Sequence, residues 1–352
     1  MAESDGLPGP RQRHRATASA SARADVSYPR KRRSLLCISQ SFSPDTTPTA
    51  IRASKLLEHL SAQWDIVVLT EAERPSGSDQ PRVEVVRSWR PTRLIAAMRR
   101  LRLGKLLELL VWPDESIFWT APAFLAGRRL IRELEPSAIV VFMMPYSAGL
   151  VGIALSRLSG LPLILNLDDS PTCTDMHPYF PTPMHYRLAK ALEDFYARSA
   201  DAVVYVSQTN LDTVSARQPE HVAEKFHLVR YGADRADSPP QDTRADHFEI
   251  AYVGAMSGWW TLIGRHASAG GLKRAYVAWN RLGRYELVAL DQRTSSPAVI
   301  GRAIMDTFTA HPGWEGHVNL MIYGNPYPEP VVERAMASAG VQGVVNVLGP
   351  FP

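Results

Sequence analysis

Two apolar strands separated by a short polar linker divide this sequence into two halves. The first strand ends in Tyr-Gly-x-Asp within FHLVRYGAD, residues 226–234, and the second opens into a glycine-bounded loop within FEIAYVGAMSG, residues 248–258. The segment between them is polar and contains prolines, as linkers between domains commonly do. We therefore expect two nucleotide-binding-like domains that meet across a cleft, with a substrate site in the seam between them.

The length and composition allow two hydrophobic cores of ordinary size. The chain has 352 residues, of which 45% are hydrophobic and 21% charged, and a chain of this length usually divides into two domains. We expect a first domain over residues 34–236, a linker over 237–247 and a second domain over 248–352. The chain has two cysteines, too few for a disulfide framework, and Cys37 lies in a predicted buried strand, which indicates a reducing compartment.

The positive charge is concentrated in the first 33 residues. These carry eight Arg or Lys against three acidic residues, a net charge of +5, whereas the remainder carries 31 basic and 32 acidic residues, a net charge of −1. The tail has almost no large apolar residues, so we expect it to be disordered. Its basic clusters could contact anionic lipid or nucleic acid, but a solvated extension is the simpler interpretation, and we expect no nucleic-acid partner. It lacks the apolar core of a signal peptide, which favours a cytoplasmic protein.

One segment imitates a membrane span. Residues 136–156 contain no charged side chain, and about twenty such residues are enough to cross a bilayer. A proline and several small residues interrupt this segment, which divides into the β-branched run AIVVFMM and the small-residue stretch SAGLVGIALSRL. We interpret it as a strand followed by a helix.

Short apolar runs alternate with helical patterns along the whole chain. Such an alternation predicts an α/β fold with doubly wound parallel sheets, in which ligands bind at the carboxyl ends of the strands. The expected strands are 34–39, 64–70, 83–86, 138–144, 162–167 and 202–207 in the first half, and 250–254, 286–291, 318–324 and 344–349 in the second. The expected helices include 121–133, 147–158, 186–199, 297–310 and 328–339.

Five short segments, taken in order, resemble the retaining glycosyltransferases of family 4, which have the GT-B fold of two Rossmann-like domains. The resemblance covers residues 34–352 except for an insert at 259–285. The segments are FSPDTTPTAIRASKLLEHL with WDIVVLT, GLPLILNLDD, LEDFYARSADAVVYVSQTNLD, FHLVRYGAD, and VNLMIYGNPYPEPVVERAMASAGVQGVVNVLGPFP. This resemblance implies a transferase that moves a sugar from a nucleotide-diphosphate donor to an acceptor with retention of configuration.

The sequence also departs from the family pattern. A glycine pair usually follows the first strand, but residues 43–48 of this chain read SPDTTP. The two glutamates of the family's donor-side motif would lie beyond Pro352. We therefore expect an incomplete second domain and a chain that is weakly active or inactive. The alternatives are a non-catalytic sugar- or nucleotide-binding module and one half of a split glycosyltransferase. A Rossmann oxidoreductase is disfavoured because no Gly-x-Gly-x-x-Gly motif follows a strand.

The resemblance implies a donor site in the second domain. A loop after its first strand could present backbone N–H groups to the pyrophosphate, and fixed cations would stabilise the charge of the leaving group. A turn with glycines is also common in α/β proteins without this role. The expected donor-binding residues are Gly254, Ser257, Gly258, Arg265, Lys273, Gly324 and Asn325.

Polar residues at strand ends of the first domain are candidates for acceptor binding and catalysis. Asp168 and Asp169 follow the strand 162–167 and could orient an acceptor hydroxyl or act as a base, although one of them could equally cap the next segment. The expected acceptor-binding residues are Ser43, Asp45, Thr46, Thr47 and Tyr146, with helix capping as the alternative for residues 45–47. We expect no metal and no cofactor, since the histidines lack ligand spacing.

A basic amphipathic segment lies between residues 87 and 112. It combines six arginines and one lysine with leucines and two tryptophans. Such a segment can lie on an anionic membrane surface, although a core-packing helix with a solvated basic face fits the pattern as well. The sequence thus predicts a glycan or lipid-linked acceptor for a cytoplasmic enzyme that is peripheral on the inner face of a membrane.

Overall fold

A computed structural model provides the structure of this protein. It describes residues 33–71, 82–86, 96–98, 100–101, 109–173, 180–232, 248–253, 270–272, 275, 279, 297–315, 317–323, 337, 340 and 345–349.

The first half of the chain forms a parallel sheet of seven strands. Its order is β3-β2-β1-β4-β5-β6-β7. The chain builds the sheet outward from β1 to β3, returns to place β4 beside β1, and then continues outward on the other side, which is the arrangement of a doubly wound fold. The predicted strands are all present, with ends that differ by a few residues at most. The strands are β1 (Ser34–Ile38), β2 (Asp65–Thr70), β3 (Arg82–Val85), β4 (Ala138–Phe142), β5 (Leu163–Leu167), β6 (Ala202–Tyr205) and β7 (Phe226–Leu228).

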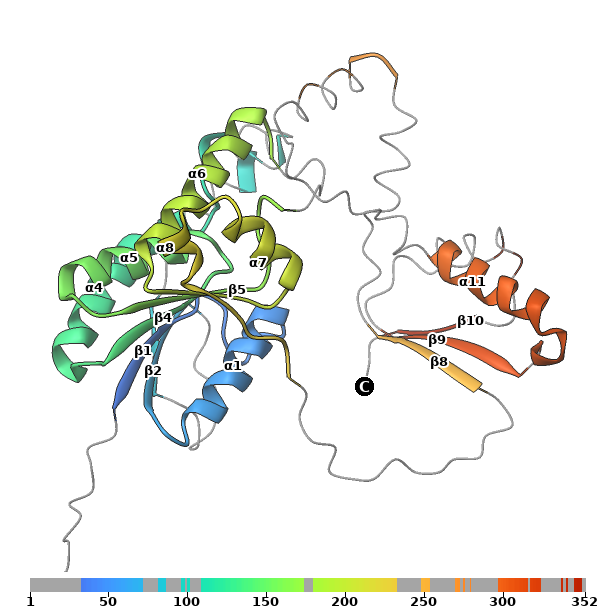
Figure 1. The fold of residues 1–352 in the computed structure, drawn as a ribbon, viewed down its shortest axis with the longest axis horizontal. Helices are drawn as coiled ribbons and strands as arrows, with labels where there is room; N and C mark the ends of the chain where they lie inside the picture. The colour runs from blue at the N-terminus through green and yellow to red at the C-terminus, as the bar shows by residue number, and fades with distance from the viewer. Residues whose placement is uncertain are drawn as a thin grey trace, which may run out of the picture. The chain divides into compact units, whose positions relative to one another are not determined.

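Helices cover both faces of this sheet, which explains why its strands are apolar throughout. Strand β1 shows the two faces, because Leu36 packs in a core with α4, α5 and α6, while Leu35 and Cys37 pack in a second core with α1. Figure 1 shows α1 on the opposite side of the sheet from α4 and α5. The helices are α1 (Pro48–Leu60), α4 (Ile117–Leu134), α5 (Ser147–Ser159), α6 (Pro183–Ser199), α7 (Gln208–Ser215) and α8 (Glu220–Ala223).

Cys37 is fully buried in this second core. Burial raises the pKa of its thiol to about 12, so the side chain stays protonated and acts as a small apolar group. The prediction that Cys37 lies in a buried strand is confirmed.

Two helices begin earlier than the sequence pattern predicts. Helix α6 begins at Pro183 because the Thr182 hydroxyl accepts a hydrogen bond from the His185 N–H at 3.3 Å, which is an N-cap followed by proline at the first helical position. Helix α4 begins at Ile117 and keeps Pro122 inside it. Proline there removes a backbone hydrogen bond, which is why the sequence favours a later start.

The uncharged segment at residues 136–156 is a strand followed by a helix, as predicted, since β4 leads into α5. Gly152 allows this helix to approach the sheet, because a Cβ at this position would lie 2.4 Å from a methyl carbon of Val141 on β4. Among the described residues, no helix combines the length and the apolar character needed to cross a membrane.

The second half contributes a parallel sheet in the order β10-β9-β8. Helix α11 occupies the predicted range Pro297–Ala310 and lies between β8 and β9 in the sequence. A short 3-10 helix, Pro312–Trp314, follows it. The strands are β8 (Phe248–Val253), β9 (Val318–Tyr323) and β10 (Val345–Gly349). The expected strand at 286–291 and nearly all of the expected helix at 328–339 lie outside the described residues.

Candidate functional site at the carboxyl edge of the first sheet

The loops after β1, β4 and β5 lie at one edge of the seven-stranded sheet, because all of its strands are parallel. Strand order reverses between β1 and β4, and in open α/β sheets ligands bind at the carboxyl ends of the strands at such a switch point. The predicted acceptor-side residues all follow one of these three strands. The fold therefore brings the sequence candidates of the first half to the same edge.

The loop after β1 is held by hydrogen bonds between its own side chains. The Ser41 hydroxyl donates to the Asp45 carboxylate at 2.8 Å and lies 2.9 Å from the Thr47 hydroxyl. Thr47 is the N-cap of α1, since its side chain accepts a hydrogen bond from the Ala50 N–H at 3.3 Å. The capping alternative is thus correct for Thr47, while Asp45 remains exposed beside it.

The other two predicted residues of this loop differ in their surroundings. The backbone N–H of Ser43 donates to the Ser54 hydroxyl at 3.1 Å, which ties the loop to α1. Thr46 is exposed. The loop is therefore a fixed polar rim that exposes Asp45, Thr46 and Thr47 at its surface, of which Thr47 caps α1.

Asp168 is buried, with a relative exposure of 8%. One carboxylate oxygen accepts a hydrogen bond from Arg52 of α1, with which it forms a buried ion pair, and the other accepts from the Thr49 hydroxyl at 2.9 Å. Both oxygens therefore already have strong partners within the protein. This environment fits a residue that fixes α1 to the end of β5 better than one that exchanges protons with a substrate.

Asp169 has a different environment. It is exposed, and its carboxylate accepts a hydrogen bond from the Asn210 amide of α7 at 3.5 Å. Loss of hydration and the charge of Asp168 raise the pKa of the Asp169 carboxyl above its usual value of 3.8, and the Asn210 hydrogen bond offsets this only in part. Its backbone carbonyl accepts a hydrogen bond from the Tyr146 hydroxyl at 3.1 Å, so two predicted residues are in direct contact.

Tyr231 completes the surroundings of the ion pair. The Arg52 guanidinium lies over its ring, 5.2 Å from the centroid, which is within the range of a cation–π interaction. Partial burial and the Asp168 carboxylate raise the pKa of the Tyr231 hydroxyl to about 12. Tyr231 belongs to the Tyr-Gly-x-Asp motif noted in the sequence, but no role was predicted for it, nor for Arg52, Thr49 or Asn210.

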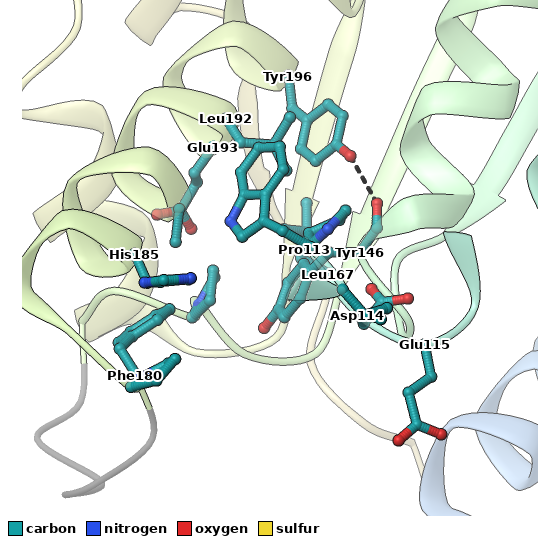
Figure 2. A pocket seen from close by; sticks show the side chains of 15 residues that line it. Pro113, Asp114, Glu115, Tyr146, Leu167, Phe180, His185, Leu192, Glu193 and Tyr196 are labelled. Carbon is teal, nitrogen blue, oxygen red and sulfur yellow. Dashed lines mark hydrogen bonds between the residues drawn. The ribbon is translucent and has the colours of Figure 1, made fainter. Parts of the chain in front are cut away.

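A cavity of about 200 Å³ lies beside Tyr146 and the end of β5. Figure 2 shows side chains of α6, among them His185, Leu192 and Tyr196, facing Asp114 and Tyr146 across it. The Tyr196 hydroxyl donates to the Tyr146 carbonyl at 2.6 Å, and this hydrogen bond is the dashed line in Figure 2. The cavity therefore shares a wall with the residue that contacts Asp169.

The walls of the cavity are anchored by buried polar contacts. The Asp114 carboxylate accepts hydrogen bonds from the N–H and the hydroxyl of Ser147, at 3.0 and 2.7 Å, and so caps the beginning of α5. Glu193 is almost fully buried and accepts from the Tyr205 hydroxyl at 2.9 Å and from Arg217 at 2.6 Å. Burial opposes the charge on Arg217, but Glu193 and Asp194 outweigh it and hold the pKa of Arg217 above its usual value.

The predicted donor-binding residues lie outside the residues that the structure describes. These are Gly254, Ser257, Gly258, Arg265, Lys273, Gly324 and Asn325. Most of the basic segment 87–112 and of the insert 259–285 lies outside them as well. In the described part of the chain, no group of three or more His, Cys, Asp or Glu side chains could hold a metal ion.

Comparison with known proteins identifies the family of this chain. A profile described as "Glycosyl transferase 4-like domain" matches residues 49–232, which is just over half of the chain. The chain belongs to this glycosyltransferase family. The resemblance proposed from the five sequence segments is thus confirmed, and the match includes Asp168, Asp169 and Tyr146. A search of curated protein sequences finds no match.

A search of solved structures finds proteins that resemble this chain. The complex of Anabaena Alr3699/HepE with UDP is 15% identical, with a TM-score of 0.52, and the alignment covers 90% of this chain and 69% of that one. The same Anabaena protein with UDP-glucose gives 17% identity, 91% and 69% coverage and a TM-score of 0.48. WaaG, a glycosyltransferase involved in lipopolysaccharide biosynthesis, is 10% identical, with a TM-score of 0.46, and the alignment covers 90% of this chain and 70% of that one. The GT-B fold expected from the sequence is confirmed.

Proposed function

We propose that this protein transfers a sugar from a nucleotide-diphosphate donor to the hydroxyl of a glycan or lipid-linked acceptor, with retention of configuration. In this proposal the first half binds the acceptor and the second half binds the donor. The observation that supports it is the group of polar side chains at the switch point of the first sheet, in a chain that belongs to the glycosyl transferase 4-like family. The UDP bound to the Anabaena protein supports a uridine-diphosphate sugar as the donor.

Within the acceptor site we assign Asp169 the role of orienting the acceptor hydroxyl or accepting its proton. Its carboxylate is exposed, whereas that of Asp168 is held by Arg52 and Thr49. A raised pKa brings a carboxylate closer to the pKa needed for proton transfer near neutral pH. Asp45 and Thr46, exposed on the loop after β1, would bind further hydroxyl groups of the acceptor.

The test uses the full chain with UDP-glucose and other nucleotide sugars. Donor binding is expected to raise the melting temperature, and transfer is expected to release the nucleotide diphosphate only when a suitable acceptor is present. Asp169→Asn should retain the melting-temperature shift and lose transfer, because the second half binds the donor. The anomeric configuration of the product, read by NMR, tests retention. Absence of both the shift and transfer with every nucleotide sugar would refute the proposal.

We also propose that residues 87–112 contact an anionic membrane surface. The described parts of this segment include three leucines that are strongly exposed, Leu101, Leu109 and Leu110. Exposed leucines beside arginines favour the membrane interface. Replacing Arg99, Arg100 and Arg102 with Glu should abolish binding to liposomes that contain anionic lipid, and unchanged binding would count against this role.

A further inference from the structure

The cavity beside Tyr146 has a specific chemical character. We propose that it binds a compact apolar group of the acceptor, about the size of a phenyl ring, so that the acceptor is a neutral amphiphile at this position. The inference deepens the proposed function and rests on it for the identity of the ligand as an acceptor. Three observations carry it: the size of the cavity, the chemistry of its walls and its position.

The size of the cavity sets the size of its ligand. Its volume is about 200 Å³, and an engineered apolar cavity of about 150 Å³ in another protein is large enough to bind benzene. A single ring therefore fits, whereas a long lipid chain or a disaccharide does not. The cavity would take one end of an acceptor and leave its sugar or hydroxyl outside.

The walls select an apolar and uncharged group. Apolar and aromatic residues from α6, from the end of β5 and the loop after it, and from the segment before α4 form most of the surface, including Trp112, Leu167, Phe180 and Leu192. The charged residues among the described lining are acidic, Asp114, Glu115 and Glu193, and the described lining contains no Arg or Lys. Glu193 is already paired with Arg217, whereas a phosphate placed beside Asp114 and Glu115 would meet no lysine or arginine in the described lining, which makes its binding unfavourable.

The position of the cavity connects it with Asp169. Tyr146 lines the cavity and donates its hydroxyl hydrogen bond to the backbone carbonyl of Asp169 at 3.1 Å. Leu167, another lining residue, is the last residue of β5 and precedes the acidic pair. A ring held here would therefore leave the adjoining part of the acceptor at the carboxyl edge, where the proposed acceptor hydroxyl is needed.

The experiment compares phenyl and methyl β-glucoside binding to the full chain by calorimetry or ligand-observed NMR, without donor. Burial of the ring should make the phenyl compound bind roughly tenfold more tightly. Ala189 lines the cavity, whereas Ala191 is exposed on the same helix and is not part of the lining. Ala189→Leu should remove the phenyl advantage and leave methyl glucoside binding unchanged, and Ala191→Leu should change neither.

Ala189 packs with Phe180 and Tyr186, so a larger side chain there can prevent folding. A second pair of variants therefore tests the cavity independently. Leu192→Ala enlarges the cavity and should move the preference from the phenyl to the naphthyl glucoside, whereas Leu188→Ala, at an exposed position of α6, should not. Equal binding of the phenyl and methyl compounds, equal effects within a matched pair, or binding of phenyl phosphate as tight as that of phenyl glucoside would overturn the proposal. A UDP-dependent melting shift in that case leaves the transferase proposal standing. Ring selectivity without any nucleotide response refutes the transferase proposal instead.

Discussion

The ion pair between Arg52 and Asp168 provides the sharpest test of how the first sheet holds its site. Only 7% and 10% of the two side chains are exposed. Asp168→Asn keeps the shape of the side chain and a hydrogen-bond acceptor for Thr49 but leaves the Arg52 charge buried without a counter-ion. The neutral variant therefore isolates the contribution of the charge.

The expected loss is large for a single substitution. Two charges about 4 Å apart interact by about 4 kcal/mol at an effective dielectric constant near 20, and removing one partner of a buried pair commonly costs about 3–5 kcal/mol. Arg52 also has a terminal nitrogen, Nη2, that is buried and has no hydrogen-bond partner among the residues that the structure describes, so the pair is incompletely satisfied there. Arg52→Met combined with Asp168→Leu should consequently restore most of the stability that either single substitution removes.

Urea denaturation of the wild type, Arg52→Met, Asp168→Leu and the double variant gives the coupling free energy directly, and Asp168→Asn is measured in the same series. Glu84→Gln is the matched control, because Glu84 pairs with Arg129 at the surface, where the side chains are 29% and 55% exposed, and exposed pairs contribute only about 0–1 kcal/mol. If Asp168→Asn costs no more than Glu84→Gln, or if the coupling is near zero, the pair does not fix α1 to β5 as argued.

Three further substitutions test other parts of the first half. The pKa of Asp169 is raised in the folded state, so its ionisation destabilises the fold as the pH rises from 3.8 through the folded-state pKa and has no effect below 3.8. The melting temperature of Asp169→Asn should therefore rise relative to that of the wild type between pH 3 and 7. A difference in melting temperature that does not change with pH would contradict this. Thr47→Ala should cost about 1 kcal/mol in urea denaturation by removing the N-cap, whereas the neighbouring Thr46→Ala should stay within about 0.5 kcal/mol. Gly152→Ala should cost about 1–3 kcal/mol in the same assay because the new Cβ would collide with Val141, and an unchanged midpoint would show that α5 can move away.

The strand pattern of the first half could be predicted because both faces of the sheet are buried. Continuous apolar runs such as SLLCI and AIVVF leave few alternatives to a central parallel strand. Helix ends were harder to predict, because the caps depend on local geometry. Helix propensity alone would exclude proline from a helix interior. Pro122 nevertheless lies inside α4, because the packing of the rest of the helix outweighs the local cost.

The site could be predicted only in part. Strand ends identify which loops meet at the carboxyl edge, so the sequence predicts that Asp168, Asp169 and Tyr146 lie at the same edge. The partners of these residues come from helices distant in the sequence, and the separation of 116 residues between Arg52 and Asp168 leaves no local pattern. The cavity was not predicted, because its walls come from segments that are separate in the sequence: the segment before α4, the loop after β4, the end of β5 with the loop after it, and α6.

The different environments of Asp168 and Asp169 follow from strand geometry. Successive side chains of a strand point to opposite faces of the sheet, and Leu163, Leu165 and Leu167 of β5 pack in the core on the side of α5 and α6. Continued beyond β5, this alternation directs Asp168 toward α1 and Asp169 toward the other face. The contacts agree, because Asp168 pairs with Arg52 of α1 while Asp169 meets Asn210 and Tyr146. An acidic pair at the end of a buried strand therefore provides two carboxylates with different surroundings, one that holds a helix and one that stays exposed.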